Sequence, residues 1–231
     1  DQIHVTTIDI EVQSDEGFPE PDKANFPVIS ICTKSSKESF YRVWGLGEFV
    51  PEQDTVYVKC ESELQLIDTF LKYWNGHGMP DVVTGWNIKG FDIPYLVNRT
   101  RKVLGEESVK KWSIWGLVSS RVVRGKMGMK DIDTYDLAGI AQLDYYDLFR
   151  KFTLNTLGQQ ESYLLDHIAN VVLGERKLSY EEHGNLHTLY KNDHQKFIEY
   201  NIKDVELVDK LEQKLGLITL AMTMSYRGGV N

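Results

Sequence analysis

Cysteine is scarce in this sequence, which has only Cys32 and Cys60 in 231 residues. A small secreted fold held by disulfides needs several cysteine pairs, so that class is excluded. Both thiols lie in strand-like runs, and we expect them to be reduced and packed. No stretch approaches the ~20 consecutive apolar residues that cross a bilayer, so we expect no membrane contact.

The sequence also lacks an initiating methionine and the basic and apolar segments of a secretory signal peptide. We interpret it as an excised domain or processed fragment of a cytoplasmic protein. Hydrophobic residues make up 42% and charged residues 26%. These values are ordinary for globular proteins and exclude disorder and collagen-like repeats.

Positive charge is in deficit overall, with 26 Lys and Arg against 34 Asp and Glu, a net charge of −8. This balance argues against binding of nucleic acid by bulk electrostatics. Residues 99–130 are the exception, with nine basic and two acidic side chains. This local excess is either a solvated face or a basic patch that contacts a ligand.

Residue patterns predict one α/β domain over residues 1–231, with a mixed sheet flanked by helices. Alternating and β-branched runs predict strands at 3–12, 28–33, 40–44, 56–59 and 81–85. Helices are predicted from 64 to about 76 and at 93–104. A β-hairpin is expected at 118–136 with its tip at 125–128, followed by a largely helical region from 147 onward.

The last long helix, predicted at about 193–215, carries an acid within its apolar face. Asp204 lies on that face, with Tyr200 one helical turn before it. Burial of an unpaired carboxylate is costly, so Asp204 needs a cation or strong donors. The simpler alternative is a loop cap or an arginine pair. Four charged residues fall on the opposite face and are expected to meet solvent: Glu199, Lys203, Glu206 and Lys210.

Two further elements offer carboxylates at core positions. Asp9 and Glu11 project from one face of the first strand, while Ile8 and Ile10 take the other. Such a pair also occurs on wet edge strands. Asp92 precedes Ile93-Pro94, so its simpler interpretation is a helix N-cap.

Together these three elements place four carboxylates near one core, with a tyrosine beside the last. Oxygen ligands of this kind suit two hard cations, Mg²⁺ or Mn²⁺. Two such ions clamp both sides of an in-line phosphoryl displacement. The combination therefore predicts metal-dependent phosphoryl chemistry.

The three motifs Asp9-Ile10-Glu11, Asn87-x-x-x-Phe91-Asp92 and Tyr200-x-x-x-Asp204 resemble those of the DEDDy 3′–5′ exonucleases. More closely, the chain is similar to the proofreading domain of family B DNA polymerases of the T-even bacteriophage type. The resemblance implies a ribonuclease H-like fold with a protruding β-hairpin. It implies that Asp9, Glu11, Asp92 and Asp204 bind two divalent metal ions.

The resemblance also assigns the surrounding residues. Tyr200 would orient the attacking water, and Lys177 matches a lysine near the scissile phosphate; its alternative is a surface lysine. Asn87 and Phe91 match positions that hold the unpaired 3′ end, Phe91 by stacking on a base. The hairpin would help to part primer from template through basic residues that include Arg121, Arg124 and Lys126. Its tip is short, which puts strand separation in doubt.

The family's palm signatures D-x-x-S-L-Y-P and D-T-D do not occur in the chain. We therefore expect a fragment of a larger polymerase, without its N-terminal, palm, fingers and thumb domains, or a stand-alone nuclease. Expected partners are the 3′ end of single-stranded or primer-template DNA and the remaining polymerase domains in cis. The protein is expected to be monomeric and, if viral, to act in the host cytoplasm. Two alternatives stay open: a silent primer-binding module and a DEDD nuclease that acts on RNA.

Overall fold

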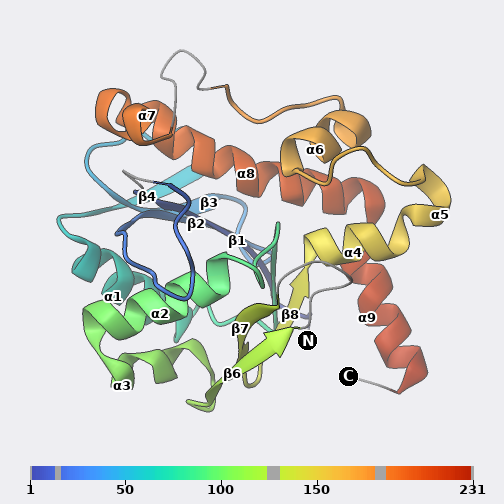
Figure 1. The fold of residues 1–231 in the computed structure, drawn as a ribbon, viewed down its shortest axis with the longest axis horizontal. Coiled ribbons are helices and arrows are strands. Elements are labelled where there is room, and N and C mark those ends of the chain that lie inside the picture. Colours follow the sequence, from blue (N-terminus) through green and yellow to red (C-terminus); the bar gives the residue numbers. More distant parts are fainter. Residues whose placement is uncertain (1, 14–16, 124–130, 180–185, 230–231) are drawn as a thin grey trace.

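The computed structural model describes residues 2–13, 17–123, 131–179 and 186–229. A six-stranded mixed sheet forms its centre, in the order β4-β3-β2-β1-β5-β8 (Figure 1). The strands are β1 (Val5–Val12), β2 (Val28–Ser35), β3 (Tyr41–Leu46), β4 (Thr55–Cys60), β5 (Val82–Gly85) and β8 (Ala141–Asp144). The predicted mixed α/β architecture of ribonuclease H-like type is confirmed. The short strand β8 was not predicted.

Helices cover both faces of this sheet (Figure 1). On one face lie α1 (Glu63–Trp74) and α2 (Asp92–Leu104), and on the other lies α8 (His194–Leu215). Beyond the sheet follow α3 (Glu106–Val109), η1 (Lys110–Trp112), α4 (Tyr145–Phe152), α5 (Leu154–Leu157), α6 (Leu165–Leu173), α7 (Leu186–Asn192) and α9 (Leu217–Gly228). Among the described residues, no helix combines the length and apolar composition that a bilayer crossing needs.

Strand β1 lies inside the sheet, antiparallel to β2 and parallel to β5. Its pairing with β5 covers only Val5–Thr7, because β5 ends at Gly85. A glycine is needed there, since a Cβ would lie 2.4 Å from the carbonyl oxygen of Ile8. The second half of β1 therefore has no strand beside it on the β5 side, which leaves room for side chains from other elements.

The core explains the alternation along β1. Ile8 and Ile10 are buried among α1 and α2 side chains, as predicted. On the opposite face, Cys32 packs against α8 residues such as Phe197 and Val205. Both cysteines are buried and free, as expected.

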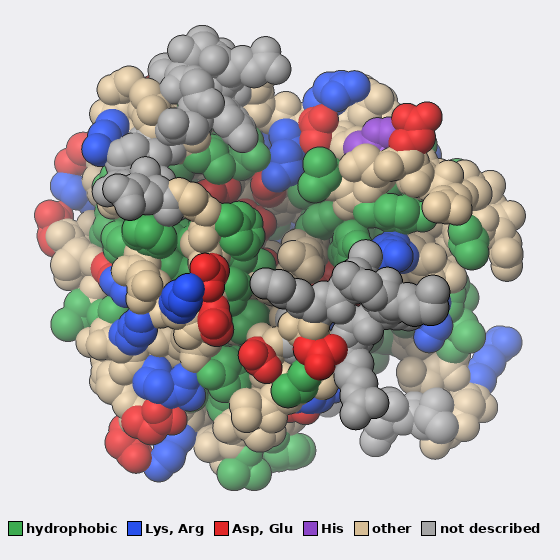
Figure 2. Space-filling view, in the orientation of Figure 1, with side chains coloured by type: hydrophobic (Ala, Val, Ile, Leu, Met, Phe, Trp, Pro, Cys, Tyr) green, Lys and Arg blue, Asp and Glu red, His purple; other side chains and the backbone are tan. Residues whose placement is uncertain are grey.

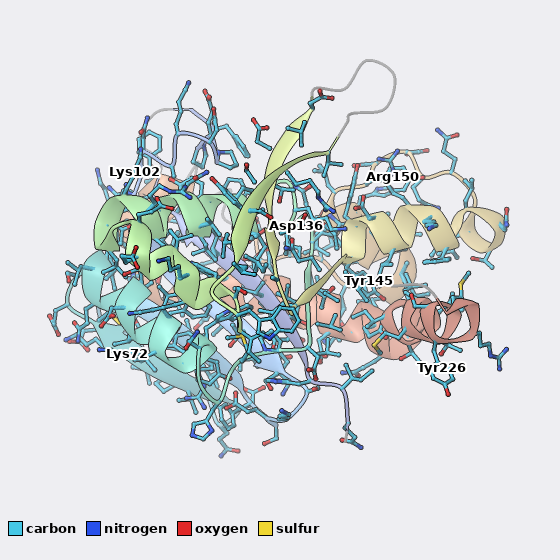
Figure 3. All side chains as sticks on the ribbon, turned by 90° about the horizontal axis from the view of Figure 1, so that it is seen from below. Lys72, Lys102, Asp136, Tyr145, Arg150 and Tyr226 are labelled. Atoms are coloured by element: carbon cyan, nitrogen blue, oxygen red, sulfur yellow. The ribbon has the colours of Figure 1, made fainter. Side chains whose placement is uncertain are left out.

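Strands β6 (Val118–Val123) and β7 (Ile132–Leu137) form the predicted antiparallel hairpin. The register pairs Val118 with Leu137 and Val123 with Ile132. The hairpin projects away from the body between α2 and α4 (Figure 3). Its predicted tip at 125–128 lies outside the described residues.

Candidate metal-dependent nuclease site

Three carboxylates from two elements meet on the α8 face of the sheet. Asp9 and Glu11 project from β1 because alternate residues of a strand share one face. Asp204 reaches them from α8, and one oxygen from each carboxylate lies within 4.8 Å of the others. Glu11 and Asp204 are buried, and Asp9 is partly covered. Three of the four carboxylates that the sequence predicted to converge form this close group, and Asp92 is not part of it.

The helical turn between Tyr200 and Asp204 brings both side chains to this group. Tyr200 is 7% exposed and Asp204 is 5% exposed, so the predicted buried face of α8 is confirmed at its polar positions. Apolar neighbours on the same helix, such as Phe197 and Val208, anchor it against the core. The acid is therefore held inside an otherwise apolar face.

Asp92 approaches the same strand from the first turn of α2. It is the first residue of that helix and 3% exposed, and its Oδ1 accepts a hydrogen bond from the Ile10 N–H at 3.1 Å. This donor lies in the half of β1 that β5 does not reach. The N-cap interpretation is wrong, because Phe91 holds the cap position and Asp92 binds a distant backbone group.

Lys177 contacts the acids directly rather than lying free on the surface. Its Nζ donates to Oδ2 of Asp204 and to the Tyr200 hydroxyl at 3.3 Å. Its backbone N–H donates to Asp166 Oδ1 at 2.9 Å, and the neighbouring Arg176 pairs with the same carboxylate. The surface-lysine alternative is thus excluded, and Asp204 has a lysine partner instead of an arginine.

Salt bridges on the outer side of α8 hold the segment that carries Lys177. Glu175 accepts from Lys203 at 2.9 Å and from Lys210 at 2.8 Å, and both lysines also pair with Glu206. Lys203 keeps only 19% of its side chain exposed. The expectation that this face of α8 simply meets solvent is wrong, because residues 174–177 fold back over it.

Burial is the main cause that raises the pKa of all four carboxyls. The pKa of Glu11 rises to about 8, helped by repulsion from Asp204. That of Asp92 rises to about 7 although backbone N–H donors oppose the shift. The pKa of Asp9 rises well above its usual value. Burial also raises the pKa of Asp204, and the positive charge of Lys177 opposes that rise. Burial opposes the charge of Lys177, but the attraction of Asp204 and its neighbours raises the Lys177 pKa.

The donor set fits a divalent cation. Asp204 Oδ1 is buried and has no hydrogen-bond donor among the described residues. One carboxylate oxygen each of Asp9, Glu11 and Asp204 lies within 4.8 Å of the other two. A hard cation would supply the missing partner and would offset the repulsion that raises the carboxyl pKa values.

Asn201 is a site residue that sequence reasoning missed. It is fully buried, and its Nδ2 donates to Asp9 Oδ2 at 2.7 Å. Its Oδ1 accepts from the Ser30 hydroxyl of β2 at 2.7 Å. The residue lies beside Tyr200 in the third motif, but no local pattern indicates that its amide reaches a strand nearly two hundred residues earlier.

Asp144 was also missed, and it organises the loop that leads to Asp92. Its carboxylate accepts from the backbone N–H groups of Asn87, Lys89 and Tyr146, all at 2.9–3.0 Å. The Asn87 backbone has a φ of +67°, a conformation that asparagine tolerates better than most residues. The side chain of Asn87 is exposed, as a residue that meets a ligand would be.

Phe91 lies partly buried beside an exposed aromatic ring. Its ring centroid is 5.5 Å from that of Phe18 and 5.4 Å from that of Tyr95. Phe18 is 75% exposed, so its ring is open to solvent. The pair forms an apolar surface next to Asp92.

Of the three basic hairpin residues named from the sequence, the structure describes only Arg121. Arg121 on β6 pairs with Asp136 on β7 at 3.3 Å and keeps nearly half of its side chain exposed. Arg124 and Lys126 lie outside the described residues. The face that carries the hairpin is hollowed between the surface over α2 and that over α4 and α6, and acidic side chains line the hollow (Figure 2).

This fold and this carboxylate group are typical of ribonuclease H-like nucleases. The family model described as DNA polymerase family B, exonuclease domain, matches residues 1–168. The chain belongs to this family. This confirms the family resemblance found in the sequence motifs, and it implies use of divalent metal ions.

Similarity to known polymerases extends over almost the whole chain. The chain is 32% identical to the DNA-directed DNA polymerase of Enterobacteria phage T4 and 33% identical to that of Escherichia phage RB69, in each case over 97% of its length. The DNA polymerase delta catalytic subunit of Bos taurus is 30% identical over 99% of the chain. The chain spans 27%, 27% and 21% of the lengths of these relatives.

Proposed function

We propose that this chain is a 3′→5′ exonuclease that removes mispaired nucleotides from the 3′ end of single-stranded or frayed DNA. It would be the proofreading part of a family B DNA polymerase. The observation that carries the proposal is the meeting of Asp9, Glu11 and Asp204 within 4.8 Å, with Lys177 in contact with Asp204. Like charges buried together are costly and are useful when they bind cations.

Asp9, Glu11, Asp92 and Asp204 would hold two divalent metal ions, Mg²⁺ or Mn²⁺. When bound, such ions lower the pKa of water and neutralise charge on a reacting phosphate. Asp9 is pre-oriented for ligation because Asn201 fixes one of its oxygens. Asp92 is held at its position by the Ile10 N–H. Rigid placement of ligands of this kind reduces the reorganisation needed for ligand binding.

Tyr200 and Lys177 would act on the water and the phosphate. Burial raises the pKa of Tyr200, so the hydroxyl stays protonated at neutral pH and can orient a water molecule by hydrogen bonding. Lys177 keeps its positive charge, because its pKa is also raised. That charge would attract the scissile phosphate and offset the developing negative charge.

The unpaired 3′ end would bind along the edge formed by Asn87, Phe18 and Phe91. An exposed aromatic pair offers a face on which a base can stack, with little dependence on its identity. Arg121 on the hairpin would contact the backbone of the DNA. Because the net charge is −8, affinity would come from metals, stacking and local basic groups.

We further propose that residues 1–231 form a single exonuclease domain that acts as a monomer next to other polymerase domains in cis. The lengths of the relatives support the presence of further domains in such proteins.

Digestion of a 5′-labelled single-stranded DNA with Mg²⁺ or Mn²⁺ tests the activity. A ladder that shortens by one nucleotide at a time is expected, and Asp9→Ala/Glu11→Ala should abolish it. The exposed pair Asp22→Ala/Glu52→Ala is a matched control, because it removes the same charge away from the site. Equal cleavage by both double variants, or internal cuts, would contradict the proposal. A matched RNA strand tests the alternative substrate, which faster RNA digestion would favour.

A further inference from the structure

An arginine on α4 contacts two aromatic rings that meet edge to face. The guanidinium carbon of Arg150 lies 5.3 Å from the ring centroid of Tyr146 and 5.1 Å from that of Tyr163. One of its terminal nitrogens also donates to the Tyr146 hydroxyl at 3.0 Å. The contacts with the two rings and the hydrogen bond to Tyr146 restrict the orientation of the Arg150 guanidinium. Its other N–H groups stay available as hydrogen-bond donors.

Arg150 differs from most of the described arginines because none of the described carboxylates lies within salt-bridge distance of it. Five others form ion pairs: Arg42, Arg99, Arg101, Arg121 and Arg176. Arg150 is nevertheless exposed. An arginine that is fixed in orientation, exposed and without an acid partner is suited to bind an external anion, and the planar fork matches phosphate well.

The Arg150, Tyr146 and Tyr163 side chains are connected to the loop that carries the second motif, residues 87–92. Trp86 Nε1 donates to the carbonyl oxygen of Tyr163 at 3.2 Å, and the Trp86 and Tyr146 rings lie 5.9 Å apart. Asp144 links this loop to α4, because its carboxylate accepts from the Asn87 and Tyr146 N–H groups. Arg150 is thus tied to the residues next to Asp92 through short contacts.

Arg150 also faces the side of the molecule on which a strand would approach. It lies on the side of α4 toward which the β6–β7 hairpin projects, whereas Tyr145 lies on the other side, toward α9 (Figure 3). The hollow lined by acidic side chains opens on the same face as the hairpin (Figures 2 and 3).

We propose that Arg150, oriented by Tyr146 and Tyr163, binds a backbone phosphate of single-stranded DNA on the 5′ side of the nucleotide that enters the carboxylate site. The inference rests on the proposed exonuclease function, since that function defines which end of the strand enters. It adds a contact for the strand outside the catalytic group and gives the acidic protein a local cation for the phosphate chain. The contact is independent of base identity.

Binding of two oligonucleotides by the full chain tests this contact. Fluorescence anisotropy would use 5′-labelled dT3 and dT12 in Ca²⁺ buffer, with a denaturing gel to verify that the strands stay intact. Arg150→Ala should weaken dT12 binding about fivefold at 0.1 M salt and make the slope of log K against log salt about 0.7 less negative. Binding of dT3 should change much less, because a short strand does not reach Arg150.

Arg227→Ala is the matched control, since Arg227 is another exposed arginine outside the ion pairs above and lies on α9. An unchanged dT12 affinity in Arg150→Ala, or an equal loss in both variants, would overturn the inference. An equal loss for dT3 and dT12 would do so as well, because it indicates a distorted site. If Arg150→Ala lowers the melting temperature strongly, Arg150→Gln replaces it and Arg150→Lys should retain the salt slope.

The exonuclease ladder, measured on the same preparations, separates this inference from the proposed function. Loss of dT12 affinity on removal of Arg150 without any ladder in the unsubstituted chain would support the phosphate contact and contradict the exonuclease. A ladder in the unsubstituted chain, together with unchanged dT12 binding in Arg150→Ala, would support the exonuclease and contradict the phosphate contact.

Discussion

The side-chain amide of Asn201 on α8 donates a hydrogen bond to Asp9 Oδ2 on β1 at 2.7 Å. The same amide accepts from Ser30 on β2, so one buried residue ties two strands to the helix that carries Asp204. With these two hydrogen bonds, both the amide oxygen and the amide nitrogen of Asn201 have a partner, as a buried amide requires. Asn201 therefore positions Asp9, a carboxylate that we propose as a metal ligand.

Asn201→Ala should weaken metal activation more than it weakens DNA binding. Loss of a group that orients a metal ligand typically costs about 10- to 100-fold in metal affinity or activity. The measurement is exonuclease rate against Mn²⁺ concentration, with Ser30→Ala as the milder control because it removes only the outer bond. An unchanged half-saturating Mn²⁺ concentration in Asn201→Ala would contradict this role.

Lys177→Met should destabilise the metal-free protein at alkaline pH. Lys177 is 25% exposed and lies against Asp204, so its removal leaves buried carboxylates without their nearby cation. We expect a loss of about 1–3 kcal/mol in the free energy of unfolding at pH 8, measured by urea denaturation. Addition of Mg²⁺ should recover part of it. The exposed Lys151→Met is the control, and an equal loss in both variants would argue against the charge explanation.

Metal-free stability should fall as pH rises toward 8. In the folded protein the pKa of Glu11 is about 8 and that of Asp92 about 7, above their ordinary values near 4 in the unfolded chain. Between these limits the folded state binds more protons, so its stabilising contribution is complete below about pH 4 and is lost as pH rises through the folded pKa values. We expect the melting temperature in EDTA to drop by about 5 °C or more from pH 6 to pH 8.5.

Glu11→Gln should flatten that dependence, because the variant no longer loses a proton there. Mg²⁺ should raise the melting temperature more at pH 8 than at pH 6, since it competes with protons for the same oxygens. Scanning fluorimetry across this range measures both effects. A metal-free melting temperature that rises toward pH 8.5 would contradict the assigned directions.

Phe18→Ala should weaken binding of single-stranded DNA while leaving the fold intact. Its side chain is 75% exposed, so little apolar burial is lost, but the exposed ring beside Phe91 is removed. Stacking of one base contributes about 1–3 kcal/mol, or about 5- to 150-fold in affinity. The salt slope should not change, because no charge is removed. Val50→Ala, at a position 76% exposed, is the matched control.

The periodicities of the sequence were sufficient to predict most elements and the facing of the acids. Alternation along residues 3–12 placed Ile8 and Ile10 opposite Asp9 and Glu11, and the helical period placed Tyr200 and Asp204 on one buried face. These patterns are local, and the backbone geometry of a strand or helix fixes the face on which each side chain lies. The family resemblance added the grouping of the three motifs.

Only the tertiary structure revealed how the acids are held. Asn201 reaches Asp9 across the sheet, Asp144 accepts from the Asn87 and Lys89 N–H groups of a distant loop, and Glu175 anchors the segment of Lys177 over α8. None of these contacts follows from spacing along the chain, because each joins groups that the fold alone brings within hydrogen-bond distance. The local patterns and motifs were enough to propose which residues carry the chemistry. The packing of α8 on the sheet and of residues 174–177 on α8 places the partners that orient them, because these contacts depend on the fold and not on local spacing.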